Sequence, residues 1–504
     1  MGSSELLIVL DRESGAPLQQ QLCDQVVALV RAGRLRAGEG VPASRELARQ
    51  LGVSRTVVTR AYEVLTARGV LEARRGSGTR VAEQAGLGGE AVAAGGGGRL
   101  SPQPPRATDG SDALWQPWEP APAHLPGGGV DFRHGTPALS DFPVARWRQS
   151  MHEAYGRADA AALGYGAAEG AATLRAEIAA LVRQSRALDA SADQIVVTAG
   201  ATQALDILVR TLVGPGDVVV IEDPSHTVLR QVFGCSQAVV VPVPVDGEGL
   251  RVADIDACVR AHGRDPGQVK LVYVTPSHQF PTGVIMSGSR RRALLAWAYE
   301  HGATVLEDDY HNEFTFTEQR LPALAAERHR GTVVYVGSFS KTLFPALRIG
   351  YAVLPPRLVQ PFLGIKWITD RLTPTVAQEA LADFISAGAY ARHISRMTRL
   401  YRQRRRQLLE SLYEHFGAGV RISGEAAGLH VLLTLVGLPR VREEAIVRLA
   451  AERGVRVYPA SGYFVQSPPA EPTFLMGYAA LPAPRITEGV ALLADAVREA
   501  ASVR

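Results

Sequence analysis

Apolar residues recur at two different spacings along this chain. Near the amino terminus, helical spacing predicts a helix that Gly33 would end, with Leu22, Val26, Leu29 and Val30 on one face. Beyond residue 130, short apolar runs alternate with helical patterns: DQIVVTAG, DVVVIEDP, KLVYVTPS, ATVLEDD and TVVYVGSFS. Such runs predict a mostly parallel sheet that helices cover on both faces. From about residue 373, long arginine-rich helices precede GLHVLLTLVG and FLMGYAAL, which predicts a smaller α+β domain.

The segment VPASRELARQLGVSRTVVTRAYEVL predicts two short helices in succession. Ser44 would cap a helix over residues 45–51, Gly52 would end it, and Ser54 would cap a second helix over 55–68. In that second helix we expect Val57, Ala61 and Leu65 to face the core. The polar side chains left near its start are Arg55, Thr56, Thr59 and Arg60. In a recognition helix, this part enters the major groove of DNA.

The run LEARRGSGTRVA then predicts two strands around a Gly-Ser-Gly turn, with arginines that reach DNA phosphates or a minor groove. Residues 1–82 contain twelve arginines and eight acidic residues, an excess equal to the net charge of +4 of the whole chain. A basic surface confined to this region favours a phosphate-rich partner. The alternative, an ordinary helix pair with solvated arginines, explains neither the hairpin nor the localised charge.

Residues 17–82 resemble the winged helix-turn-helix of GntR-family transcription regulators, on the motifs PLQQQL, AGEGVPASRELARQLGVSRTVVTRAYEVL and RGSGT. The resemblance implies double-stranded operator DNA with two half-sites as a partner. The candidate DNA-binding residues are Ser44, Arg45, Ser54, Arg55, Thr56, Thr59, Arg60, Arg74, Arg75 and Gly76. We expect a DNA-binding domain over 1–83, a Gly/Pro-rich linker over 84–129 and an effector domain over 130–504.

Composition indicates the class of protein and the cellular compartment in which these domains would fold. With 504 residues, 46% hydrophobic and 21% charged, the chain fits an ordinary globular protein of two or three domains. Its three cysteines show no paired spacing, so we expect no disulfide framework, no metal site and a reducing cytoplasm. No leader and no long apolar segment is evident, so we expect no membrane partner.

Only three of the 54 basic residues are lysines, and one of them, Lys341, stands in SFSKTLFPALRIGY. A lysine that forms a Schiff base needs a lowered pKa, and pyridoxal 5'-phosphate (PLP) also needs an anion site and an acid for its pyridine nitrogen. In VVTAGATQALDIL a strand would meet a helix at amides suited to a phosphate. In ATVLEDDYHNEF, Asp308 and Tyr310 follow a buried strand. Taken singly, each signal also fits a surface lysine, a capping carboxylate or an ordinary turn.

Together, the order AGATQAL, EDPSH, SHQFPTG, EDDY and SFSKTLFPALRIGY resembles the fold-type I, class I aminotransferases from about residue 130 onward. The resemblance implies Lys341 as the Schiff-base lysine, Asp308 as the pyridine partner and Tyr310 as the hydroxyl partner. The phosphate contacts it implies are Ala201, Thr202, Ser338 and Arg348, and Ser340, next to Lys341 in the chain, can add a further phosphate donor. Tyr165, in YGAAEG, would reach the phosphate of a partner subunit in a homodimer.

Three positions depart from that aminotransferase pattern. Phe280 stands where an asparagine commonly bonds the cofactor, so His278 or Gln279 would substitute, and His226 replaces a stacking tyrosine. Leu475 stands where these enzymes usually read the substrate α-carboxylate with an arginine. An apolar side chain cannot replace that charge-assisted pair, which disfavours both transamination and sensing of an ordinary amino acid.

A winged helix joined to an aminotransferase-like domain resembles the MocR subfamily of bacterial regulators, which are head-to-tail homodimers. We therefore expect a PLP-binding transcription regulator that senses PLP or a small amine and controls vitamin B6 metabolism, as PdxR-type members do. Three alternatives stay open: a GabR-like regulator of amine catabolism, a working aminotransferase with a DNA-binding appendage, and a constitutive DNA-binding protein with an inactive domain.

Overall fold

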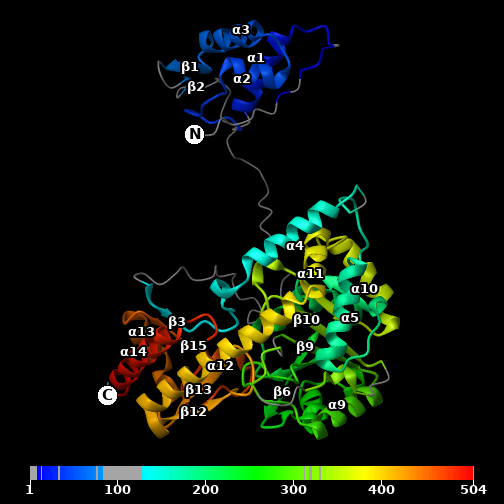
Figure 1. Cartoon of the computed structure of the whole chain (residues 1–504), viewed down its shortest axis with the longest axis vertical. Coiled ribbons are helices and arrows are strands. Elements are labelled where there is room, and N and C mark those ends of the chain that lie inside the picture. The colour runs from blue at the N-terminus through cyan, green and yellow to red at the C-terminus, as the bar shows by residue number, and fades with distance from the viewer. Residues whose placement is uncertain are drawn as a thin grey trace. The chain divides into compact units, whose positions relative to one another are not determined.

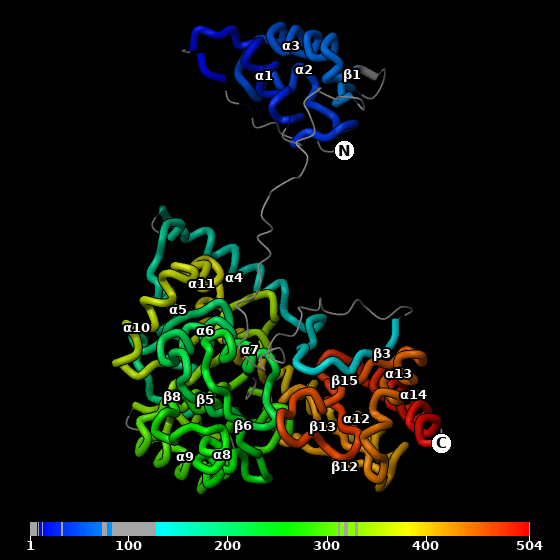
Figure 2. The backbone as a smooth tube through the Cα atoms, turned by 180° about the vertical axis from the view of Figure 1, so that it is seen from behind, coloured from blue at the N-terminus to red at the C-terminus, as the bar shows by residue number. Residues whose placement is uncertain are grey.

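The computed structural model describes residues 8, 10–12, 14–31, 34–74, 78–82, 128–160, 162–310, 313–316, 321–327 and 331–502. The chain divides into two compact units, Met1–Arg106 and Ala107–Arg504 (Figures 1 and 2). Gly33, Arg75, Gly76 and most of the predicted linker lie outside the described residues. Within the described ranges, no helix has both the length and the apolar content that crossing a membrane requires.

The first unit contains the two predicted helices and the hairpin. Its elements are α1 (Leu18–Arg31), α2 (Ser44–Leu51), α3 (Arg55–Ala67), β1 (Leu71–Arg74) and β2 (Gly78–Val81). Helix α1 buries Leu22 and Val26 against α3, as the helical spacing predicted, and β1 pairs antiparallel with β2. Gly52 ends α2 in the left-handed conformation at φ 62°, which a glycine adopts without strain.

Two details of the predicted helix pair were wrong, at Ser44 and Val57, and the cap at Ser54 was confirmed in position only. Ser44 is the first residue of α2 rather than its cap, and the capping position belongs to Ala43. Ser54 holds the capping position of α3, but its side chain makes no capping hydrogen bond. Val58, not Val57, is the fully buried valine of α3. The three-residue spacing from Val58 to Ala61 places both side chains on one helical face.

The second unit is built on a mixed sheet in the order β4-β11-β10-β9-β8-β5-β6-β7. The strands are β4 (Ile195–Thr198), β5 (Val218–Asp223), β6 (Val239–Asp246), β7 (Gly249–Leu250), β8 (Val269–Val274), β9 (Thr304–Asp309), β10 (Val333–Ser338) and β11 (Gly350–Val353). The five apolar runs of the sequence form β4, β5, β8, β9 and β10, as predicted. The ladder from β10 to β6 is parallel, whereas β11 is antiparallel to both neighbours. The carboxyl ends of β8 and β9 therefore lie side by side.

Both faces of this sheet are buried. Alternate residues of β5 point to opposite cores, with Val219 and Ile221 on one face and Val218 and Val220 on the other. The first face packs against α6 (Ala201–Leu212), α7 (Thr227–Cys235) and α10 (Pro356–Thr369). The opposite face packs against α5 (Ala172–Arg186), α8 (Ile255–Ala261) and α9 (Gly288–His301).

A smaller α+β region follows in the chain, as predicted. Its sheet has the order β12-β13-β16-β15, with β12 (Val420–Ser423), β13 (His430–Leu435), β15 (Tyr458–Pro459) and β16 (Thr473–Gly477). A separate pair joins β3 (Val130–Asp131) to β14 (Val455–Arg456). The remaining helices are α4 (Val144–Arg157), α11 (Thr375–Ser386), α12 (Ala389–Phe416), α13 (Glu443–Glu452) and α14 (Ala483–Ser502). The long helix α12 runs from the large sheet to the small one and packs against α14 (Figure 1).

Candidate cofactor site and DNA-binding surface

Most of the predicted DNA-binding residues of α2 and α3 lie on the surface. Arg45, Ser54, Arg55, Thr56 and Arg60 are exposed. The side chains of Ser44 and Thr59 are partly buried. The Arg55 guanidinium donates to Ser44 Oγ at 3.4 Å, which joins the starts of the two helices. Arg74 ends β1, and Arg75 and Gly76 fall outside the described residues.

In the second unit, a cavity of about 260 Å³ lies at the carboxyl ends of the large sheet. Residues from the start of the unit, from the large sheet and from the small sheet meet there. Its walls are His134, Gly135, Ala201, Thr202, His226, Tyr273, Phe280, Tyr310, Ser338, Ser340, Lys341, Arg348 and His430. Eight of the predicted cofactor residues are among them.

The start of α6 forms one end of this cavity. Gly200 precedes the helix at φ +88°, and a Cβ there would lie 2.7 Å from Nη2 of Arg348, so only glycine fits. Gly350 is equally constrained, because its Cβ would lie 2.9 Å from the amide nitrogen of Ala201. Arg348 donates from Nη2 to the carbonyl of Ala199 at 2.7 Å. A helix amino terminus and a guanidinium at one point favour an anion.

Lys341 is part of the cavity wall. A Cβ on Gly135, at φ +70°, would lie 3.2 Å from Lys341 Nζ, so the glycine leaves the amine accessible. Burial lowers the pKa of Lys341, the positive charge of Arg348 lowers it further, and Asp308 opposes the shift. A larger fraction of this amine is therefore unprotonated, and nucleophilic, than in an ordinary surface lysine.

Asp308, near the end of β9, is not itself a wall residue but contacts one, Tyr273. Its Oδ2 accepts a hydrogen bond of 2.8 Å from the Tyr273 hydroxyl. Its Oδ1 is buried and has no hydrogen-bond partner among the described residues. Burial raises the pKa of Asp308 to about 6, and the Tyr273 hydrogen bond opposes that rise. A protonated ring nitrogen is the partner that this carboxylate lacks.

These atoms fit PLP, which requires an aldehyde acceptor, a ring-nitrogen partner and a phosphate site. Lys341 supplies the amine, and the free Oδ1 of Asp308 supplies the acceptor for the ring nitrogen. Ser340 Oγ is also buried without a described partner, at the same wall as Ser338 and Arg348. The phosphate would lie among these side chains and the amides of Ala201 and Thr202.

Other predicted cofactor residues lie differently. His278 is buried but does not line the cavity. Its Nδ1 lies 3.2 Å from the hydroxyl of Tyr310, and this contact orients the Tyr310 hydroxyl. The amide of Gln279 points away and donates to the carbonyl of Pro224 at 2.7 Å. Tyr165 is 79% exposed and faces the guanidinium of Arg371. The structure contains one chain, so its contact with a partner subunit stays a prediction.

Several cavity residues were missed in the sequence. Tyr273 carried a weak signal, because it is the single tyrosine of a valine-rich buried strand. His134, Gly135 and His430 carried none, because they reach the cavity from the segment after β3 and from the start of β13, far from Lys341 in the chain. Burial lowers the pKa of His134 and of His226 to about 4, so these imidazoles are neutral at pH 7.

Leu475 has the apolar surroundings expected from its sequence. It is fully buried in β16 in a cluster with Phe280, Leu432 and Ala460. Tyr310 packs against the same cluster, and both Phe280 and Tyr310 line the cavity. On this side the cavity wall therefore contains the rings of Phe280 and Tyr310, and Leu475 packs in the cluster that they contact.

Comparison with known proteins agrees with this division of the chain. Residues 18–81 match the gntR family of bacterial regulatory proteins, and residues 130–490 match aminotransferase class I and II. The chain is 34% identical over 97% of its length to a probable rhizopine catabolism regulatory protein, MocR, of Rhizobium meliloti, covering 96% of that protein. It is 30% identical to the pyridoxine biosynthesis transcriptional regulator PdxR of Corynebacterium glutamicum, covering 92% of both chains.

Aminotransferases are among the solved structures that resemble the chain. The crystal structure of LysN, an alpha-aminoadipate aminotransferase of Thermus thermophilus with N-(5'-phosphopyridoxyl)-L-leucine, matches 75% of this chain and 94% of its own. Its TM-score is 0.66 at 30% identity. Together with the site geometry, these matches identify a PLP-binding domain of fold-type I attached to a DNA-binding domain. The chain belongs to the MocR-type transcription regulators of the gntR family, which combine a winged helix-turn-helix with an aminotransferase-like domain.

Proposed function

We propose that this regulator senses PLP, or a small amine that reacts with it, through the cavity at Lys341, and that occupancy changes DNA binding by the winged helix. The observation that carries the proposal is the convergence of three groups on one cavity. They are the Lys341 amine and the start of α6, which line the cavity, and the buried carboxylate of Asp308, which bonds to the lining residue Tyr273 and has an unpartnered Oδ1. Bound PLP supplies an aldehyde for covalent attachment and an electron-withdrawing ring.

The residues of this chain would divide the binding between them. Lys341 offers an amine whose pKa is already lowered, so attachment costs less deprotonation energy. Asp308, oriented by Tyr273, would accept a hydrogen bond from the protonated ring nitrogen. The positive charge of that nitrogen would favour the ionised form of Asp308. Arg348 and the start of α6 bind the phosphate. His226, an imidazole on the cavity wall, provides a planar face for the ring.

PLP itself is the preferred effector. Leu475 and its apolar cluster offer no charged partner for the carboxylate of an amino acid, and a similar regulator is named for pyridoxine biosynthesis. We therefore propose control of vitamin B6 metabolism. An amine without a carboxylate is the second candidate, because it needs no charged partner from the Leu475 cluster. Catalytic transamination is the third, because the lysine, the carboxylate and the phosphate donors are all present.

The proposed setting is a cytoplasmic, head-to-tail homodimer on two operator half-sites. The exposed Tyr165, which in similar folds reaches a partner's phosphate, supports the dimer. We propose the domain limits 1–83, 84–129 and 130–504, which the matched ranges 18–81 and 130–490 support. A switch requires that PLP binds one arrangement of the two DNA-binding domains more tightly than the other.

The test uses the full-length chain and a labelled duplex from the region upstream of its own gene. Fluorescence anisotropy should show DNA affinity changing with added PLP in the wild type, and no change in Lys341→Ala. A PLP response that persists in Lys341→Ala would contradict the proposal. Absorbance measurements with a panel of amino acids address the enzyme alternative, since repeated turnovers at enzyme-like rates would overturn a purely regulatory role.

A further inference from the structure

A second lysine, Lys366, is completely buried in α10, on the face of the large sheet that also carries α6. Its Nζ lies 2.8 and 3.0 Å from the two carboxylate oxygens of Asp370 and 3.2 Å from Thr373 Oγ1. The three ammonium hydrogens therefore match three acceptors. An arginine would bring five donors in a rigid plane to the same small space, which explains a lysine in a chain that otherwise uses arginine.

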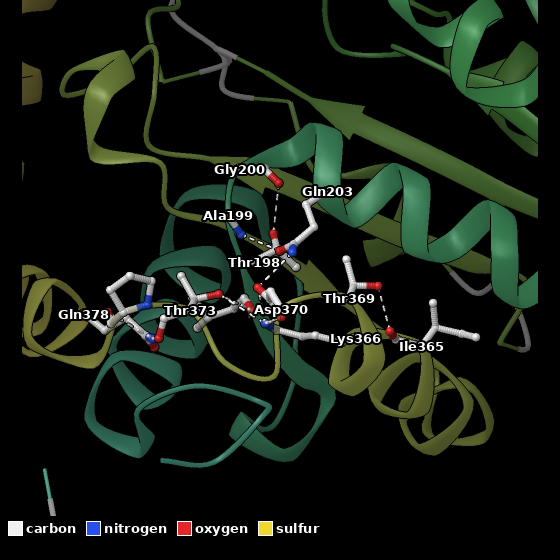
Figure 3. A network of polar contacts seen from close by, with 12 residues as sticks. Thr198, Ala199, Gly200, Gln203, Ile365, Lys366, Thr369, Asp370, Thr373 and Gln378 are labelled. Carbon is white, nitrogen blue, oxygen red and sulfur yellow. Dashed lines mark hydrogen bonds and ion pairs between the residues drawn. The ribbon is translucent and has the colours of Figure 1, made fainter. Parts of the chain in front are cut away.

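The Lys366–Asp370 pair is connected to the turn that begins α6 (Figure 3). Gln203 donates from Nε2 to Asp370 Oδ2 at 2.8 Å. The oxygen of the same amide accepts from the backbone nitrogen of Ala199 at 2.7 Å. The side chain of Gln203 therefore links the buried ion pair to the backbone between β4 and α6.

With this link, both backbone polar groups of Ala199 are hydrogen-bonded. Its nitrogen is held by Gln203, and its carbonyl accepts from Arg348 at 2.7 Å. Thr198 Oγ1 also donates to the carbonyl of Gly200 at 3.1 Å. The amides that follow, at Ala201 and Thr202, are those at the cavity. Amides fixed before a ligand arrives bind it with a smaller entropic cost.

We propose that Lys366 is a positioning residue for the phosphate of PLP, acting through Asp370 and Gln203 on the turn at Ala199. This inference rests on the proposed function, because it takes the start of α6 as the phosphate site. The alternative is a buried ion pair that stabilises the fold without reference to the cofactor. The two roles predict different results for substitution of Lys366: a positioning role weakens binding only of ligands that carry the phosphate, whereas a purely structural role does not distinguish them.

The test compares PLP with pyridoxal, which lacks the phosphate, in full-length protein. We expect Lys366→Met to weaken PLP binding about tenfold, the equivalent of about one hydrogen bond, and to leave the dissociation constant for pyridoxal unchanged. Lys270→Met is the matched control, because Lys270 is exposed on β8 and should change neither constant. Equal weakening of both ligands, or no weakening, would overturn the inference.

A second variant decides the matter if Lys366→Met does not fold. Gln203→Met keeps both members of the Lys366–Asp370 pair and removes the two hydrogen bonds of the Gln203 amide, to Asp370 and to Ala199, at a partly exposed position of α6. It should show the same selective loss of PLP, and an unchanged preference for PLP over pyridoxal would contradict the inference. Failure of the proposed function is a separate result, since it is read from the wild type and Lys341→Ala, in the response of DNA affinity to PLP, and not from the ligand preference of these variants.

Discussion

The two units of this chain place their functional groups in opposite ways. In the first unit, most of the candidate DNA contacts come from the starts of α2 and α3, close together in the chain, and the side chains of Arg45, Arg55 and Arg60 are exposed. In the second unit, the candidate cofactor contacts come from positions as distant as His134 and His430 and lie around a cavity. A surface for a large polyanion needs only a helix face, whereas a small ligand needs groups converging from several elements.

The largest expected effect separates the two units. Lys341→Ala should lose covalent PLP completely, because no imine can form, so the cofactor should be removed by desalting along with its visible absorbance. DNA affinity without PLP should not change, because Lys341 belongs to the other compact unit. Lys270→Ala serves as the control. Retention of the absorbance after desalting of Lys341→Ala would show that another group holds the cofactor.

A substitution on α3 should have the converse effect. Arg60→Ala should weaken binding to the specific duplex roughly tenfold to hundredfold, because an exposed arginine near the start of a recognition helix contacts base edges or phosphates. PLP binding should be unchanged. The matched control is Arg49→Ala on α2, whose guanidinium is exposed and already paired with Glu46. If both variants bound DNA like the wild type, α3 would not be the recognition helix.

Two adjacent valines test the core of the first unit. Val58→Ala should lower the free energy of unfolding of this unit by about 2 kcal/mol, because the side chain is fully buried. Val57→Ala, at a half-buried position, should cost less. Thermal unfolding should show the shift in one transition only. An equal cost for both valines would contradict the described register of α3.

The smallest effect concerns pH in the cofactor-free protein. Burial lowers the pKa of His226 from 6.5 to about 4, and the positive charge of Lys341 adds to the shift. Between these values the unfolded chain binds a proton that the folded chain does not, so stability is lost as pH falls from 6.5 to about 4. His226→Asn, which preserves a capping residue for α7, should reduce that loss in urea unfolding at pH 7 and pH 5.

Asp308 provides a control, because burial shifts its contribution to stability with pH in the direction opposite to that of His226. Its pKa is raised from 3.8 to about 6, so its contribution is present below pH 3.8 and is lost as pH rises through 6. Asp308→Asn should therefore change the slope of stability against pH in the direction opposite to His226→Asn. If both substitutions changed the slope in the same direction relative to the wild type, burial would not be the cause of the two pKa shifts.

The sequence predicted the fold more completely than the site. Short apolar runs located five of the eight strands of the large sheet, and Gly52 marked the end of α2. Helix capping was predicted less well, because the hydroxyl of Ser44 contacts Arg55 instead of its own helix. The choice between Val57 and Val58 depended on how α3 packs against α1, which no local pattern records.

By itself, the sequence determined the parts whose physics is local: the strands, the winged helix, and a lysine in a setting where arginine cannot form an imine. The tertiary structure alone decided which groups meet. It brought His134 and His430 to Lys341, turned Gln279 away from the cavity, and joined Lys366 to the start of α6. The physical reason is that hydrogen-bond partners and burial depend on elements remote in the chain, and these set each group's charge and orientation.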